Sequence, residues 1–183
     1  QVASPSGERL EMIELPSLHL HQDNLLNRVR GAMVNHRQVI MCAQTGLGKT
    51  RIAKWILGAT ANREPKPHQS GKSLFVVHRR GLVDNAVESF NEYPAVPHGV
   101  IMSGEETNYG RRIQIASIDT MLSWFVEDGN YPSDITFDLI VFDECHSHHP
   151  KFAKFLSYHD ARRQSLGQRP AYDLPTTPLG VRM

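Results

Sequence analysis

Residues 43–50, AQTGLGKT, combine residue types that can hold a polyphosphate. Gly46 and Gly48 let the backbone curl, so that successive N–H groups point inward and form an anion-binding nest. Lys49 can reach the outer phosphates, and the Thr50 hydroxyl can bind Mg²⁺. A helix beginning here would add its positive N-terminal end. The stretch predicts a Walker A phosphate loop made by Thr45, Gly46, Leu47, Gly48, Lys49 and Thr50.

A second group that could do chemistry is the acidic pair that ends the apolar run 139–142. A magnesium–nucleotide site needs a carboxylate on a neighbouring strand to hold the metal, and a group that orients the attacking water. We expect Asp143 to take the first role and Glu144 the second. Buried strands often end in acids, so the pair gains its meaning from the phosphate loop earlier in the same chain.

The segment 145–149, CHSHH, raises the alternative of a zinc site, because Cys and His are zinc ligands. Adjacent residues cannot easily all face one tetrahedral ion, and no CxxC pair accompanies them. We therefore expect that, of these residues, only His146 takes part in catalysis. It lies two positions after Glu144. His148 and His149 are interpreted as solvated loop residues.

The elements that must position these groups follow from hydrophobic periodicity. Apolar strands alternate with amphipathic helices, which predicts an α/β fold with a mostly parallel sheet covered by helices on both faces. Ligands of such sheets bind at the carboxyl ends of the strands, where all the candidate groups fall. Helices are expected at 22–36, 50–61, 82–90, 119–126 and 152–159, and strands at 38–43, 73–78, 99–104, 112–117 and 137–144.

Length and composition suit one compact domain. The chain has 183 residues and two cysteines. Its formal net charge is only +1, so any nucleic-acid binding must come from local basic patches. Residues 1–16 are expected to be a tail or edge segment, and 17–183 the domain. The sequence shows neither a signal peptide pattern nor an apolar run long enough to span a bilayer. We expect a cytoplasmic protein with reduced thiols and no membrane partner.

With both motifs placed, the chain resembles the first RecA-like domain of a superfamily 2 helicase of the DExH-box group, a DEAD/DEAH-like P-loop NTPase. It is most similar to type III restriction and excision-repair translocases. AQTGLGKT matches motif I of that family, in which alanine commonly opens the loop, and DECH (143–146) matches motif II. LHLHQ (18–22) resembles the family's LRPYQ segment. The resemblance implies that Gln22 hydrogen-bonds the adenine edge.

The resemblance extends to the segments that bind nucleic acid in the family. Residues 76–90 resemble motif Ia, and 113–122 resemble motif Ib, with Asp119 in the place of the family's Gln. LPTTP (174–178) resembles motif III, with Pro175 where Thr is usual, and implies that Thr177 couples hydrolysis to strand movement. For the segments after the two strands, the alternative is that Arg79 and Arg80 form a solvated basic turn and that Ser117 and Thr120 form an ordinary helix cap. The nucleic-acid contacts implied are Arg79, Arg80, Ser117 and Thr120.

These features predict an ATP-dependent helicase or translocase motor domain that uses ATP and Mg²⁺. DNA is favoured over RNA by the LRPYQ-like segment. The family's second RecA-like domain, which supplies an arginine finger, is not among these 183 residues, so we expect very slow turnover from this chain alone. A non-catalytic nucleotide- or DNA-binding module that regulates a partner is the alternative function. A small-molecule kinase with a phosphate loop is a third.

Overall fold

The computed structural model describes residues 12–127, 134–145, 149–168 and 180–181. Its helices and strands alternate along the chain, as the hydrophobic pattern predicts. The order is α1 (Leu20–Asn35), β1 (Ile40–Met41), α2 (Lys49–Ala61), β2 (Ser73–Val77), α3 (Arg80–Asn91), β3 (Gly99–Ile101), β4 (Ile113–Ser117), α4 (Ile118–Leu122), a π-helical turn η1 (Ser123–Glu127), β5 (Leu139–Phe142), α5 (His149–Ser165) and β6 (Gly180–Val181).

All strand pairings among the described residues are parallel. Four strands form a sheet in the order β3–β4–β2–β5, and β1 pairs separately with β6. Parallel strands in one sheet place their carboxyl ends at the same edge, and that edge is where α/β proteins bind ligands. The parallel α/β architecture predicted from the sequence is thereby confirmed.

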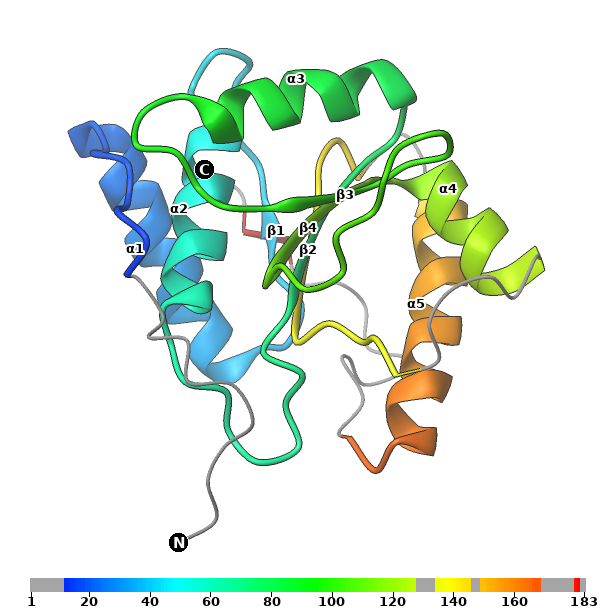
Figure 1. Cartoon of the computed structure of the whole chain (residues 1–183). Coiled ribbons are helices and arrows are strands. Elements are labelled where there is room, and N and C mark those ends of the chain that lie inside the picture. The colour runs from blue at the N-terminus through cyan, green and yellow to red at the C-terminus, as the bar shows by residue number, and fades with distance from the viewer. Residues whose placement is uncertain (1–11, 128–133, 146–148, 169–179, 182–183) are drawn as a thin grey trace, which may run out of the picture.

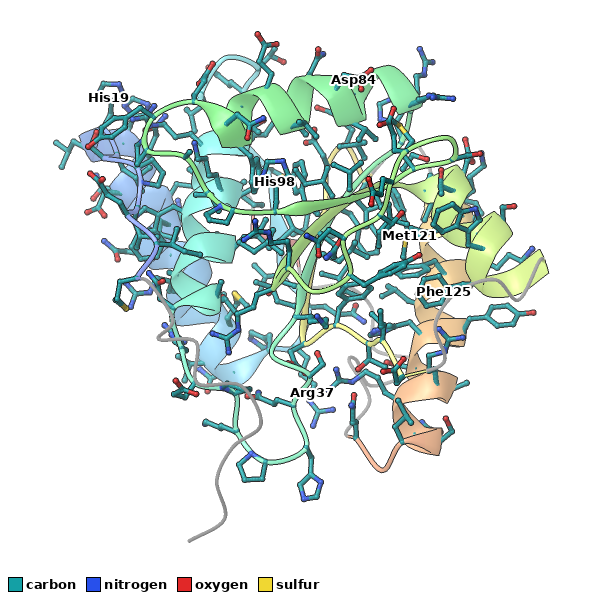
Figure 2. All side chains as sticks on the ribbon, in the orientation of Figure 1. His19, Arg37, Asp84, His98, Met121 and Phe125 are labelled. Atoms are coloured by element: carbon teal, nitrogen blue, oxygen red, sulfur yellow. The ribbon has the colours of Figure 1, made fainter. Side chains whose placement is uncertain are left out.

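The central strand β2 explains how helices cover both faces of this sheet (Figure 1). All five of its residues are buried, and successive side chains point to opposite faces. Phe75 and Val77 belong to a core shared with α2 and α3. Leu74 and Val76 belong to a second core shared with α4 and α5. In Figure 2, Met121 and Phe125 mark that second core, on the side of α4 and α5.

A third apolar cluster joins α1 to α2. Leu25, Leu26 and Val29 of α1 are buried together with Ile52 of α2. They fall on one face of α1, at the spacing that the sequence predicts for an amphipathic helix. Figure 1 shows α1 lying beside α2, on the side of the molecule away from α4 and α5. This packing sets the position of the residues that precede α1.

Several elements differ in length from the expectation. The strand expected at 38–43 is only β1, and the helix expected at 119–126 is α4 followed by the π-helical turn η1. β1 is short because only Ile40 and Met41 pair with β6. β5 is half-buried rather than fully buried, and β6 was not predicted. The helix expected at 152–159 begins earlier, since Pro150 is tolerated in a first turn, where N–H groups have no helical partner.

The segment before α1 is attached to the domain. The Ile13 N–H donates to Asn62 Oδ1 at 2.8 Å, and Asn62 Nδ2 donates to the Ile13 carbonyl at 2.9 Å. Asn62 follows the last residue of α2, so these two hydrogen bonds attach Ile13 to the end of that helix. No described helix has the length and apolar character that crossing a membrane requires.

Candidate nucleotide and nucleic-acid site

The phosphate loop connects β1 to α2 and has the backbone shape that its glycines predict. Gly46 and Gly48 adopt positive φ values of 84° and 83°, which other residues rarely adopt. The Leu47 N–H donates to the Gln44 carbonyl at 3.3 Å and closes the turn. Gly48 is the N-cap of α2, so Lys49 and Thr50 are its first helical residues. Their N–H groups belong to the first turn of a helix, which favours an anion.

Gln22 braces this loop from α1. Its side chain is buried, and its Nε2 donates to the Leu47 carbonyl at 2.9 Å. Its Oε1 accepts from the His19 N–H at 3.0 Å. A Cβ added at Gly48 would overlap the Gln22 amide nitrogen. The two polar ends of Gln22 therefore make one hydrogen bond each within the protein, and the second amide hydrogen and the second oxygen lone pair are the groups that could meet an adenine edge.

The segment that carries Gln22 is fixed to α2 by Arg51. The Arg51 Nε donates to the Ser17 carbonyl at 2.8 Å, and an Nη donates to the Ser17 hydroxyl at 3.4 Å. Arg51 follows Thr50 directly, so the first turn of α2 and the start of α1 are connected. No motif or periodicity signals this contact, because Ser17 and Arg51 lie far apart in the chain.

Lys49 joins the phosphate loop to the acidic end of β5. Its Nζ lies 3.3 Å from Glu144 Oε1 and 3.5 Å from the Ala43 carbonyl. The two side chains are 27% and 37% exposed, so a ligand can reach both. The sequence-predicted groups are thus brought together at one edge of the fold. A phosphate bound here would compete with Glu144 for the Lys49 ammonium.

The acidic pair sits at the point where β5 ends. The Asp143 N–H donates to the Val76 carbonyl at 2.9 Å and extends the pairing with β2. Glu144 then turns into the left-handed region with φ 51°, and its N–H donates to Asp143 Oδ1 at 3.1 Å. A glutamate rarely holds this conformation, and such strain clusters at functional sites. The turn directs the Glu144 carboxylate toward Lys49.

The residues predicted to hold magnesium fit that ion chemically. The Thr50 hydroxyl and the Asp143 carboxylate are hard oxygen donors, which Mg²⁺ prefers. Across the ranges that the structure describes, no group of three or more His, Cys, Asp or Glu side chains could hold a metal. Mg²⁺ in nucleotide sites takes its remaining ligands from phosphate and water, so one carboxylate and one hydroxyl suffice.

The residues predicted to contact nucleic acid follow β2 and β4. Arg79 caps α3 and is exposed, as is Arg80. Ser117 is buried, and its Oγ accepts from the Thr120 N–H at 3.1 Å as the N-cap of α4. The two hydroxyl oxygens are 2.9 Å apart. The arginines are therefore open to a ligand, whereas the Ser117 hydroxyl is occupied in capping.

Two predicted site residues lie outside the described ranges, and several charged contacts were not anticipated. His146 and Thr177 fall within 146–148 and 169–179, respectively.

Lys151 of α5 pairs with Asp119 of α4 at 2.5 Å. The buried Lys54 Nζ donates to the Ser89 and Glu92 carbonyls, at 2.9 Å each. The only sequence signal for either was the unusual Asp119 in motif Ib.

Comparisons with known proteins agree with this geometry. A family model described as "Type III restriction enzyme, res subunit" matches residues 15–165. The SWI2/SNF2 ATPase core of Sulfolobus solfataricus, solved in complex with dsDNA, is similar with a TM-score of 0.60 and 14% identity. The UvsW helicase of bacteriophage T4 is similar with a TM-score of 0.59 and 17% identity. No curated protein sequence matches the chain.

The two structural likenesses cover most of this chain but only part of the other proteins. They span 89% and 88% of this chain, against 32% of the SWI2/SNF2 core and 55% of the UvsW helicase. At these identities a likeness shows the fold. It confirms the RecA-like α/β architecture that the motifs predicted, in which a phosphate loop and an acidic strand end share one edge of the sheet.

Proposed function

We propose that this chain, which belongs to the family of type III restriction enzyme res subunits, binds magnesium–ATP over α2 and nucleic acid over α3 and α4. The family and the fold make it an ATP-dependent motor domain of the helicase or translocase class. The observation that carries the assignment of residues is the 3.3 Å contact between Lys49 and Glu144. It places the phosphate loop against the acidic end of β5.

Each residue then has a role suited to its place. The Lys49 ammonium and the backbone N–H groups between Thr45 and Thr50, other than the Leu47 N–H that closes the turn, hold the phosphates, and Gln22 orients the base. Magnesium, when bound, neutralises phosphate charge, with the Thr50 hydroxyl and the Asp143 carboxylate as its protein ligands. Glu144 orients the water that attacks the terminal phosphate. His146 and Thr177 keep the catalytic and coupling roles that the family resemblance implies.

Nucleic acid is expected to lie across Arg79 and Arg80, which are exposed at the end of β2. Arginine suits phosphate because its planar donors match phosphate oxygens. Ser117 and Thr120 are the further contacts that the family resemblance implies, and Thr120 offers a half-buried side chain in the first turn of α4. DNA is favoured over RNA, which agrees with the dsDNA complex of the similar SWI2/SNF2 core. A second RecA-like domain is the expected partner for rapid turnover.

The assignment is tested by nucleotide binding and hydrolysis in three variants. Lys49→Ala should weaken binding of a fluorescent ATP analogue more than about tenfold, because a charge-assisted phosphate contact is lost. Glu144→Gln should retain binding and lose hydrolysis, because the neutral amide cannot act as a base. Lys66→Ala is the matched control, because Lys66 is exposed and lies in the loop before β2. It should change neither nucleotide binding nor hydrolysis.

These measurements also distinguish an ATP-hydrolysing motor domain from a non-catalytic binding module. Hydrolysis that is slow in the wild type, faster with single-stranded DNA and abolished by Glu144→Gln supports the motor. Nucleotide binding with no hydrolysis, even with a second RecA-like domain from a related protein added, would favour the regulatory module. ATP affinity that survives Lys49→Ala would contradict the site itself.

A further inference from the structure

The ion pair between Asp119 and Lys151 connects two helices at the edge of the sheet where the proposed nucleic-acid contacts lie. Asp119 is in the first turn of α4, directly after β4, and Lys151 is in the first turn of α5, after β5. The strand between β4 and β5 in the sheet is β2, and β2 leads into Arg79 and Arg80. In Figure 1 the starts of α3, α4 and α5 gather on one side of the molecule, at the upper right.

Both members of the pair are accessible to a large ligand. The Lys151 side chain is 46% exposed and the Asp119 side chain 61%, with 2.5 Å between Nζ and Oδ1. An exposed ion pair contributes little to folding stability, because water solvates both charges well in its absence. A stabilising role therefore does not account for the pair. Its position at the edge of the sheet that also carries the exposed Arg79 and Arg80 points to a role in phosphate binding.

The charges of the pair act in opposite directions on a polyanion. Lys151 offers a compact positive charge of the kind that binds a backbone phosphate. Asp119 repels the same phosphate and at the same time occupies the lysine. An uncharged residue at position 119, such as the Gln that the resembling family carries in motif Ib, would leave the lysine without this competitor.

We propose that Lys151 is a further phosphate-binding residue of the nucleic-acid face, and that Asp119 competes with the strand for it and so lowers affinity. The inference rests on the proposed function, because it requires the edge formed by α3, α4 and α5 to bind nucleic acid. A phosphate that approaches this edge displaces the Asp119 carboxylate from Lys151. The chain then releases the strand more readily than one with an uncharged residue at 119.

The experiment is a double-mutant cycle read by fluorescence anisotropy. The probe is a fluorescein-labelled single-stranded DNA of about 20 nucleotides, which is longer than the roughly 4–16 nucleotides that one OB-fold domain covers. The proteins are the wild-type chain, Asp119→Asn, Lys151→Gln and the double variant, each titrated between about 50 and 300 mM NaCl. Glu64→Gln is the control, because it removes one negative charge as Asp119→Asn does. Glu64 is exposed and lies in the loop before β2, at the opposite edge of the sheet from Asp119.

Asp119→Asn should tighten binding about three- to tenfold at the lowest salt and steepen the log–log salt dependence by about 0.7, the value for one added phosphate contact on a single strand. Lys151→Gln alone should weaken binding by a smaller factor than Asp119→Asn tightens it, because in the wild type the phosphate must first displace Asp119 from the lysine. In the double variant the gain and the steeper slope should both disappear. Glu64→Gln should leave affinity within about twofold of the wild type.

Two results would overturn the inference. If Asp119→Asn leaves affinity unchanged, Asp119 does not compete with the strand. If the gain persists in the double variant, the carboxylate acts by general repulsion and Lys151 binds no phosphate. Either result, with wild-type binding that Arg79→Gln weakens, leaves the proposed function standing. Absence of DNA binding by the wild type at every salt concentration would overturn the proposed function together with the inference.

Discussion

Glu144 and Gly48 are two residues whose backbone conformation shapes the candidate nucleotide site. Glu144 adopts φ 51°, and placing a residue with a side chain in this region costs about 1–2 kcal/mol. The conformation aims the carboxylate at Lys49, so the chain bears a local strain in order to keep the two charges together. Gly48 adopts φ 83° at the start of α2, where glycine carries no such strain.

Replacing Gly48 with alanine should disrupt nucleotide binding. A methyl group there would overlap the Gln22 amide, and the positive φ adds the cost of a left-handed residue. We expect Gly48→Ala to lower the free energy of unfolding by about 1–3 kcal/mol and to abolish binding of a fluorescent ATP analogue. Urea denaturation and an anisotropy titration measure the two effects.

Gly31→Ala is the matched control, since Gly31 lies within α1 and nothing approaches the position of its Cβ. Alanine in a helix interior is favoured over glycine by about 1 kcal/mol, so this variant should be more stable and bind nucleotide normally. Wild-type affinity in Gly48→Ala would show that the loop need not hold its described shape.

At the scale of elements, α2 and α3 are held together by an unusual buried lysine. Lys54 is 3% exposed, and its Nζ donates to the carbonyls of Ser89 and Glu92 at the end of α3. Burial lowers the pKa of Lys54, and the Glu92 charge opposes that effect. A cation at a helix C-terminus satisfies carbonyls that have no helical partner. The helix that follows the phosphate loop is thereby connected to the helix that follows Arg79.

We expect Lys54→Met to destabilise the domain by about 2 kcal/mol, because two carbonyls at the end of α3 lose a charged donor. Methionine keeps most of the length of the side chain, so the loss reports the ammonium rather than the packing. The free energy of unfolding from urea titration is the measurement. Lys66→Met removes an exposed lysine and should change it by less than about 0.5 kcal/mol. Equal stability of both variants would show that the ammonium contributes nothing.

Periodicity and motif spacing were enough to predict most elements and to expect Lys49 and Glu144 at one edge of the fold. The strands β2, β4 and β5 are apolar runs with turn residues on both sides, and AQTGLGKT and DE mark the ends of two strands. The left-handed turn at Glu144 had no such signal, because glutamate carries no preference for it. β6 is only two residues long, and its pairing with β1 depends on tertiary contacts between distant segments.

The contacts between side chains could not be predicted for a related reason. Lys49 and Glu144 were each recognised by motif, and their common edge followed from the parallel sheet. Lys54, Lys151 and Arg163 belong to no motif, and their partners lie 25 or more positions away in the chain. Periodicity reports which face of a helix is buried. It does not report which atom meets a charged group on that face.

At the scale of the whole molecule, α5 is fastened to the start of β5 by buried polar groups. Arg163 Nη1 donates to the Phe137 carbonyl at 2.6 Å and to Asp138 Oδ1 at 2.9 Å. His159 Nε2 accepts from the Phe137 N–H at 2.9 Å, so the imidazole is neutral and its proton is on Nδ1. Burial, followed by the nearby Arg163 and Arg162 charges, lowers the pKa of His159 to about 3, against a smaller opposing effect of Asp138.

This histidine should make the fold sensitive to acid. The unfolded chain binds a proton at His159 near pH 6.5, whereas the folded chain does so only near pH 3. Between these values the unfolded state holds more protons, so stability falls as the pH is lowered from 6.5. The contribution of His159 approaches about 1.4 kcal/mol per pH unit. Urea midpoints measured between pH 7.5 and about 4.5 would show the decline.

His159→Gln is the control for this prediction, because a glutamine oxygen can accept from the Phe137 N–H but does not titrate in this range. In the variant, the slope of the free energy of unfolding against pH should be smaller by the contribution of about one proton. This holds even if the variant is less stable at neutral pH. An unchanged slope in His159→Gln would place the acid sensitivity in other groups.

The pairing of Ile40 with Gly180 has a consequence for biosynthesis. The ribosome makes the phosphate-loop strand early and its hydrogen-bonding neighbour only after most of the domain has emerged. Closing so long a stretch of chain carries an entropic cost that local contacts do not repay. The strand that precedes the predicted phosphate loop therefore gains this neighbour late in translation, after the segment through Val181 has left the exit tunnel.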